Sequence, residues 1–143
     1  MFFEKKTFDK LKGFDENYFL FWEETDYCKR ANLIGLNNYI LNEVKVKHTN
    51  GVKYGSVKIS NKLEKKKLVN LYSWHFLWSK FYYYKKHYGF VYATIHFVPI
   101  ILRTIYRISL YKAINENDKV ERYTERLNGI INSLLLNKSS KRI

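Results

Sequence analysis

Cysteine, proline and long apolar runs are scarce in this chain of 143 residues. Cys28 is the only cysteine, which excludes an intramolecular disulfide and a metal site with two cysteine ligands and fits a reducing compartment. The N-terminus has no apolar core of signal-peptide length, and no uninterrupted apolar run approaches the roughly 18 to 20 residues of a membrane-spanning helix. The longest candidate, residues 90–102, is too short and contains His96 and the single proline, Pro99.

Acidic residues are also few, and they are unevenly placed. The formal net charge is +13; residues 1–30 hold seven acids against six bases, whereas residues 44–112 hold fourteen bases and only Glu64. A basic, aromatic-rich surface suits a polyanion, which means nucleic acid or the anionic cytoplasmic leaflet of a membrane. Composition leaves both open. The length fits one modest domain, or part of one.

The acids that are present gather in residues 13–30, together with many aromatic side chains. This segment contains the carboxylates Asp15, Glu16, Glu23, Glu24 and Asp26 and the aromatics Phe14, Tyr18, Phe19, Phe21, Trp22 and Tyr27. Gly13 predicts a turn, and apolar spacing predicts a helix over residues 22–34 that ends in a left-handed cap at Gly35. Acidic side chains in its first turn interact favourably with the helix dipole. Asp26 can also pair with Arg30, four residues later.

Beyond this segment, the pattern predicts one strand and three helices. β-branched residues alternate with lysine towards the end of residues 38–48, which indicates a strand. Amphipathic helices are expected over residues 68–88, 90–114 and 116–136, with Pro99 kinking or breaking the second. We expect residues 137–143 to be disordered.

With these residues laid out, the first third of the chain resembles the C-terminal part of family 2 glycosyltransferases with the GT-A fold, especially the rhamnosyltransferase-like group. The family pattern is a Gly-Phe-Asp-Glu turn, an aromatic run, an acidic pair and Asp-x-Cys-x-Arg on a helix. The chain has these motifs at residues 13–16, 18–22, 23–24 and 26–30, and the match extends to about residue 56. The resemblance implies an α/β fold, with part of a GT-A domain (helix, strand) over residues 1–60 and a helical extension over residues 61–136.

The resemblance also implies roles for individual residues. Glu24 is the expected general base that deprotonates an acceptor hydroxyl, and Glu23 and Asp26 would order the catalytic site. His48 matches a histidine that in some relatives helps to bind a divalent metal, Mg or Mn. The nucleotide-binding half of such enzymes, with its Asp-x-Asp motif, does not occur here, so the chain is expected to be inactive alone or to depend on a separate donor-binding polypeptide.

Plainer explanations exist for each feature. Acids at a helix start also complement the dipole, Cys28 suits packing, and aromatics at helical spacing are commonly core residues. Residues 90–114 could pack on a missing half or lie in a membrane interface, where a lipid-linked acceptor would be found. The alternative function is a non-catalytic basic module that binds anionic membrane or nucleic acid, of which nucleic acid is less favoured. The resemblance implies a sugar or lipid-linked acceptor and a cytoplasmic location, with peripheral attachment to the inner membrane face left open.

Overall fold

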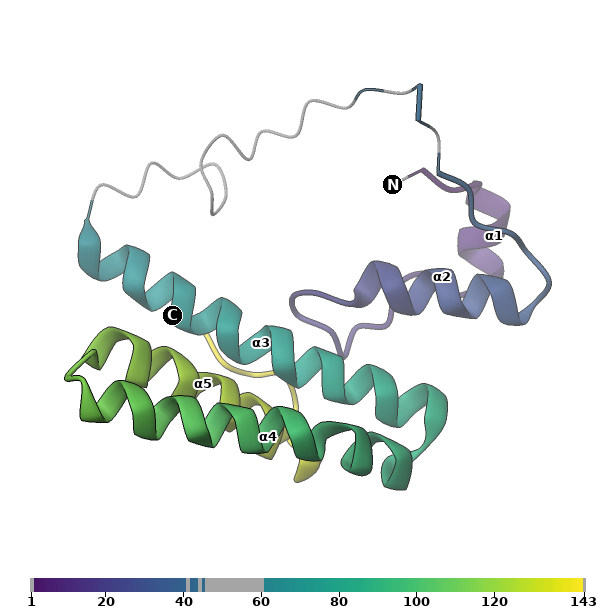
Figure 1. Ribbon diagram of the computed structural model, residues 1–143. Coiled ribbons are helices and arrows are strands. Elements are labelled where there is room, and N and C mark those ends of the chain that lie inside the picture. Colours follow the sequence, from purple (N-terminus) through teal and green to yellow (C-terminus); the bar gives the residue numbers. More distant parts are fainter. Residues whose placement is uncertain (1, 41, 44, 46–60, 143) are drawn as a thin grey trace.

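Five α-helices make up the part of the chain that the structure, a computed structural model, describes: residues 2–40, 42, 43, 45 and 61–142. They are α1 (Lys5–Lys10), α2 (Glu23–Leu33), α3 (Lys62–Tyr88), α4 (Phe90–Ala113) and α5 (Asn117–Leu134). Helices α3, α4 and α5 pack together as a bundle, and α1 and α2 lie on the other side of α3 (Figure 1). The long helix α3 therefore separates two structural layers.

The predicted α/β fold class is wrong. Of the described residues, 69% are helical and none is in a strand. The strand expected over residues 38–48 does not form at residues 38–40, 42, 43 or 45, while residues 41, 44 and 46–48 lie outside the described residues. Alternation of valine and lysine suits a strand, but a strand also needs a neighbour for its backbone hydrogen bonds. No other described segment supplies that neighbour.

The helix predictions were more accurate. Helix α2 and its left-handed Gly35, with a φ of 80°, are confirmed, as are α4 and α5 to within two residues at each end. Helix α3 begins six residues earlier than expected, where the Asn61 side chain accepts a hydrogen bond from the Leu63 N–H at 2.9 Å and caps the helix. Helix α4 continues through Pro99 without the break that we had considered.

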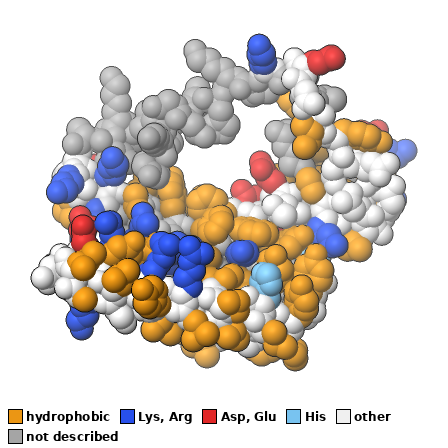
Figure 2. Space-filling model, viewed as in Figure 1, with side chains coloured by type: hydrophobic (Ala, Val, Ile, Leu, Met, Phe, Trp, Pro, Cys, Tyr) orange, Lys and Arg blue, Asp and Glu red, His pale blue; other side chains and the backbone are white. Residues whose placement is uncertain are grey.

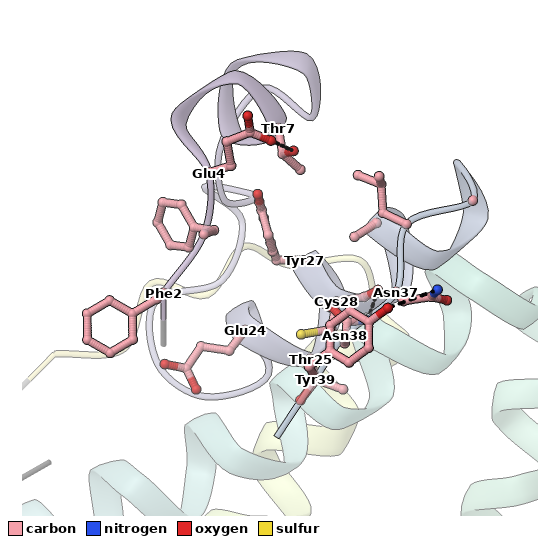
Figure 3. Close-up of a pocket in the computed structure, with 14 residues that line it drawn as sticks. Phe2, Glu4, Thr7, Glu24, Thr25, Tyr27, Cys28, Asn37, Asn38 and Tyr39 are labelled. Carbon is pink, nitrogen blue, oxygen red and sulfur yellow. Dashed lines mark hydrogen bonds between the residues drawn. The ribbon is translucent and has the colours of Figure 1, made fainter. Parts of the chain in front are cut away.

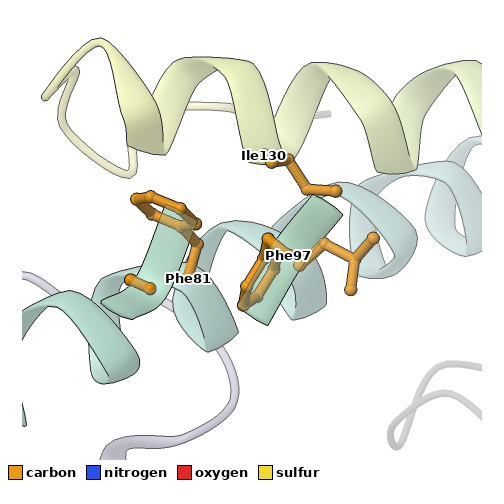
Figure 4. Packing of buried hydrophobic residues seen from close by; sticks show 5 residues of the cluster. Phe81, Phe97 and Ile130 are labelled. Carbon is orange, nitrogen blue, oxygen red and sulfur yellow. The ribbon is translucent and has the colours of Figure 1, made fainter. Parts of the chain in front are cut away.

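The core of the bundle is apolar and well buried. It comprises Leu77 and Phe81 of α3, Ala93 and Phe97 of α4, and Ile130 of α5. The Phe81 and Phe97 rings meet edge to face with centroids 5.0 Å apart, and Ile130 closes the cluster from the third helix (Figure 4). Each leucine, isoleucine or phenylalanine side chain of this kind contributes roughly 1.5 to 3 kcal/mol when it is removed from water. This cluster holds the three long helices in register.

Gly129 lets α5 approach α3 closely. A Cβ atom built at Gly129 would lie 2.3 Å from the Trp74 carbonyl oxygen, which is far inside van der Waals contact. The backbone of α5 therefore touches the backbone of α3 at this point, and only glycine fits there.

The C-terminal tail, for which we predicted disorder, lies against α3. The fully buried His75 ring makes 2.9 Å hydrogen bonds with the Ser139 hydroxyl through Nδ1 and with the Lys141 carbonyl through Nε2. Because a carbonyl only accepts, Nε2 carries the proton and Nδ1 accepts from Ser139. Burial lowers the pKa of His75, which favours this neutral form. The tail thus supplies both hydrogen-bond partners of the buried His75 ring.

Candidate functional site

The loop before α2 is tied to α3 by polar contacts. Asp15 accepts hydrogen bonds from the Tyr82 hydroxyl at 3.0 Å and the Lys86 ammonium at 2.7 Å. Burial alone would raise the pKa of Asp15, but hydrogen bonds from Lys86 and Asn17 lower it to about 2. Further along the loop, Ser79 donates to the Leu20 carbonyl at 2.8 Å. These bonds fix the approach of the loop to α2.

Asp26 is the centre of a buried charge cluster. Its fully buried carboxylate accepts from Arg30 Nε at 2.8 Å, Lys86 Nζ at 2.7 Å and His87 Nε2 at 2.8 Å. Burial would raise the pKa of Asp26, but the hydrogen bonds from Lys86, Arg30 and His87 outweigh it and hold the pKa below its ordinary value. The predicted Asp26–Arg30 pair is thus confirmed within a larger cluster that joins α2 to α3.

Arg30 also holds the turn at Gly13. Its guanidinium donates to the Leu11 carbonyl at 2.6 Å and to the Gly13 carbonyl at 2.7 Å. Gly13 has a φ of 68°, which a residue with a side chain adopts only with strain. The predicted turn and the predicted helix are therefore linked by one arginine.

Two strained residues set the start of α2. Phe21 and Trp22 both have left-handed backbone conformations, with φ of 66° and 70°. Each costs about 1 kcal/mol or more, so the surrounding packing must hold it. The Phe21 ring lies edge-on to Phe76 of α3, with centroids 5.7 Å apart, and Trp22 packs against Tyr83 at 5.1 Å. This packing fixes the direction in which α2 starts, and so the positions of Glu23 and Glu24 in its first turn.

Glu24 lies on an open pocket of about 1030 Å³, which we call the α2 pocket. It is lined by Phe2, Phe3, Glu4 and Thr7, by Glu24, Thr25, Tyr27, Cys28 and Ala31 of α2, and by residues 35–39. Figure 3 shows the Glu24 carboxylate near the Phe2 ring, and Cys28, Asn38 and Tyr39 farther across the pocket. The Glu24 side chain is exposed, and the wall mixes rings, hydroxyls and amides. Such a lining suits a sugar, which offers hydroxyl groups and apolar ring faces.

Two neighbours of Glu24 have different environments. One carboxylate oxygen of Glu23 is buried without a hydrogen-bond partner within the described residues. Cys28 is half-buried on the pocket wall, and burial, with a contribution from the charge of Glu24, raises the pKa of its thiol. A thiol held in its neutral form is a poor nucleophile, which favours the packing role that the sequence suggested for Cys28.

No metal centre is apparent among the described residues. They contain no group of three or more histidine, cysteine or acidic side chains placed to hold an ion. His48, the predicted metal ligand, lies outside them. The structure thus brings Glu23, Glu24 and Asp26 together on one helix turn but with unequal exposure: Asp26 is buried, Glu23 half-buried and Glu24 exposed.

Several residues that are important in the fold are not singled out by the sequence. Lys86 and His87, which complete the Asp26 cluster, come from α3, about 60 positions away along the chain. The arginines of α4 and α5 converge on Tyr123 of α5. The sequence gives one signal of this convergence, which is the four-residue spacing of arginines in two of the helices: 103 with 107, and 122 with 126.

Comparison with known proteins identifies no relative. No protein family, curated protein or solved structure matches this chain. A function must therefore be inferred from the residues, their geometry and the sequence resemblance.

Proposed function

We propose that this chain is the acceptor-side part of an inverting glycosyltransferase that transfers a sugar from a nucleotide-sugar donor to an acceptor hydroxyl, in cell-surface polysaccharide synthesis. The observation that supports this most directly is the exposed Glu24 carboxylate on the α2 pocket, within a sequence segment that resembles family 2 glycosyltransferases. The pocket is large enough for one or two sugar rings. Its mixed lining offers both hydrogen bonds and ring contacts.

Glu24 acts as the general base. A sugar hydroxyl attacks an anomeric carbon poorly unless a carboxylate takes its proton as the new bond forms. The carboxylate must be free to accept that proton, and Glu24 forms no ion pair with another described residue, unlike Asp15 and Asp26. Its position in the first turn of α2 is held by the strained Phe21–Trp22 pair.

Asp26 is a positioning residue in this proposal. It is fully buried and accepts three charge-assisted hydrogen bonds, so it cannot reach an acceptor. By anchoring α2 to α3 it holds Glu24 in a fixed orientation. This fits the ordering role expected for Asp26, without contact to the substrate.

Donor binding requires groups from elsewhere. The described residues bring together no set of side chains that could hold a divalent metal. We infer that a separate nucleotide-sugar-binding polypeptide or domain supplies the donor site. The complete assembly would work in the cytoplasm, on the inner face of the membrane if the acceptor is lipid-linked.

The test replaces Glu24 in the native cell and measures cell-surface polysaccharide. Glu24→Gln is expected to lower synthesis about 100-fold or more, which is the usual contribution of a general base, and Glu24→Asp should retain part of it. Glu16→Gln, a change at an exposed acid of the preceding loop, is the matched control and should leave synthesis unchanged. Full synthesis with Glu24→Gln would refute the base assignment. Sugar transfer by the purified chain alone would refute the need for a donor-binding partner.

A second candidate function is docking to an anionic membrane surface. Helix α4 is the one described helix long and apolar enough to cross a membrane, with a mean hydropathy of 1.2 over a window of 18 residues. One side packs in the bundle through Ala93, Phe97 and Thr104, whereas Ile95 and Leu102 are 67% and 62% exposed on the other. A helix that packs on one side and exposes an apolar stripe on the other can lie in the interface of a bilayer.

A further inference from the structure

Four basic side chains line a small cavity between α3, α4 and α5. The cavity has a volume of about 280 Å³, and its cations are Lys80, Arg103, Arg107 and Arg126; we call it the arginine groove. Its lining contains no acid. Figure 2 shows lysine and arginine side chains gathered along the boundary between α3 and the other two helices of the bundle. Three separate helices thus direct positive charge to one place.

Tyr123 of α5 lines the groove and contacts two of its arginines. This residue is almost fully buried, and its hydroxyl accepts a hydrogen bond from Arg107 Nη1. The guanidinium carbons of Arg107 and Arg126 lie 5.4 and 5.3 Å from the centre of its ring, within cation–π range. Burial would raise the pKa of Tyr123, but the hydrogen bonds from Arg107 and Arg122 and the nearby positive charges lower it. The ring holds the arginines in place without neutralising them.

The nearby acids of α5 are engaged elsewhere. Glu121 pairs with Lys66 at 2.5 Å and Glu125 pairs with Lys141. None of the four cations of the arginine groove has an ion pair within the described part of the chain. Burial and the neighbouring arginines lower the pKa of Arg126, the direction expected when like charges are crowded. The crowding destabilises the unliganded chain, and a bound anion would relieve it.

We propose that the arginine groove binds a phosphate or diphosphate group. Guanidinium groups present planar pairs of N–H donors that match phosphate oxygens, and several can share the charge of one group. The cavity has room for such a group. This site is separate from the α2 pocket, so it does not depend on Glu24 or on the proposed glycosyl transfer.

The position of the groove on α4 favours a phosphate carried by a lipid. Successive residues of an α-helix are rotated by about 100° around its axis. This rotation places Arg103 and Arg107 on one flank of α4. The flank lies between the exposed stripe, with Ile95 and Leu102, and the buried stripe, with Phe97 and Thr104. If the exposed stripe enters a bilayer, this flank lies at the depth of the headgroups. A free phosphate compound would reach the same groove from solution, so the experiment must separate the two sources.

The first arm measures binding of inorganic pyrophosphate to the full chain by titration calorimetry. Arg103→Gln/Arg107→Gln is expected to weaken binding about 10-fold or more, since hydrogen bonds between charged groups are stronger than those between neutral groups. The matched control is Lys65→Gln/Lys67→Gln, which removes the same charge from exposed positions of α3. Because Arg107 also packs on Tyr123, Arg103→Gln alone, at an exposed position, provides a second variant if the double variant loses its helical circular dichroism.

The second arm measures sedimentation with vesicles that carry phosphatidic acid or phosphatidylserine at matched surface charge. A preference for phosphatidic acid that disappears in the arginine variant supports a lipid-borne phosphate. Pyrophosphate binding without that preference supports the same groove with a soluble source. Equal losses in the arginine and lysine variants would show diffuse charge attraction and overturn the proposal. Failure of both probes to bind would overturn it as well.

Discussion

Asp26 shows how one carboxylate joins two parts of the chain. It lies on α2, but two of its three partners, Lys86 and His87, lie on α3. A fully buried carboxylate is stable as an anion only when each partner is in place, and loss of one partner from such a cluster commonly costs about 3 to 5 kcal/mol. Asp15 shares Lys86 with Asp26, so the two carboxylates form one connected cluster.

This cluster predicts acid sensitivity. The pKa of Asp15 is about 2 in the folded chain against an ordinary 3.8, so its stabilising effect is complete above about pH 4 and is lost as the pH falls towards 2. The loss from Asp15 amounts to about 2 kcal/mol. Urea unfolding measured between about pH 6 and pH 2 should therefore show a steeper fall for the wild type than for Asp15→Asn.

The control for this prediction is Glu16→Gln, a change at the next residue, whose side chain is exposed. It should keep the wild-type pH dependence. An Asp15→Asn chain with the same pH dependence as the wild type would show that Asp15 is not stabilised as described.

Among the elements, α3 contacts both parts of the structure. One side packs with α4 and α5 through Leu77 and Phe81, and the other binds the loop and helix that carry Glu24. This explains why α3 is rich in aromatic side chains around its circumference: several of them, including Trp74 and Trp78, are buried core residues. The packing role that we considered for these aromatics is confirmed for those buried ones.

The contact of α3 with α5 predicts the effect of a small substitution. Gly129→Ala would place a methyl group 2.3 Å from the Trp74 carbonyl oxygen, so the helices must separate. We expect a loss of about 1 to 3 kcal/mol in the free energy of unfolding, although alanine at an open helix position stabilises by about 1 kcal/mol. A close contact with α3 thus predicts a lower free energy of unfolding, and an open helix position predicts a higher one. Urea unfolding of Gly129→Ala therefore distinguishes the two.

The neighbouring change Asn128→Ala, which adds no atoms, is the control and should alter stability by less than about 1 kcal/mol. A Gly129→Ala chain as stable as the wild type would contradict the close backbone contact.

For the molecule as a whole, charge and apolar surface are arranged around the bundle. The acidic residues of the α2 pocket lie on one side of α3, and the arginine groove and the exposed stripe of α4 belong to the bundle on the other. In the functions proposed above, membrane contact and proton transfer would therefore use different surfaces.

Membrane docking predicts a specific loss of vesicle binding. Ile95→Ser/Leu102→Ser removes two apolar side chains from the exposed stripe and should weaken binding to anionic vesicles about 10-fold or more, because each buried side chain of this size contributes roughly 1.5 to 3 kcal/mol. Leu135→Ser/Leu136→Ser, at equally exposed positions after α5, should bind as the wild type does. Equal binding of both variants and the wild type would exclude α4 as the docking surface.

Local patterns predicted helices α2 to α5, with α3 starting six residues late, but did not predict the short helix α1. Apolar spacing located α2, α4 and α5, and a four-residue spacing predicted the Asp26–Arg30 pair. The strand was predicted from alternation alone and does not form at the described positions, because pairing depends on a neighbour that local sequence does not specify. The exposure of Glu24 and the burial of Asp26, two positions apart, were also beyond a local pattern.

The sequence by itself determined most of the extent of helices α2 to α5, where charge gathers and which short motif resembles a glycosyltransferase, because these properties depend on residues close together in the chain. Only the tertiary structure decided which carboxylate is available for chemistry, since Lys86 and His87 of α3 occupy Asp26 and leave Glu24 open. It also assembled the arginine groove from three helices. Contacts between distant segments depend on how whole helices pack, and that packing is not encoded in any one segment.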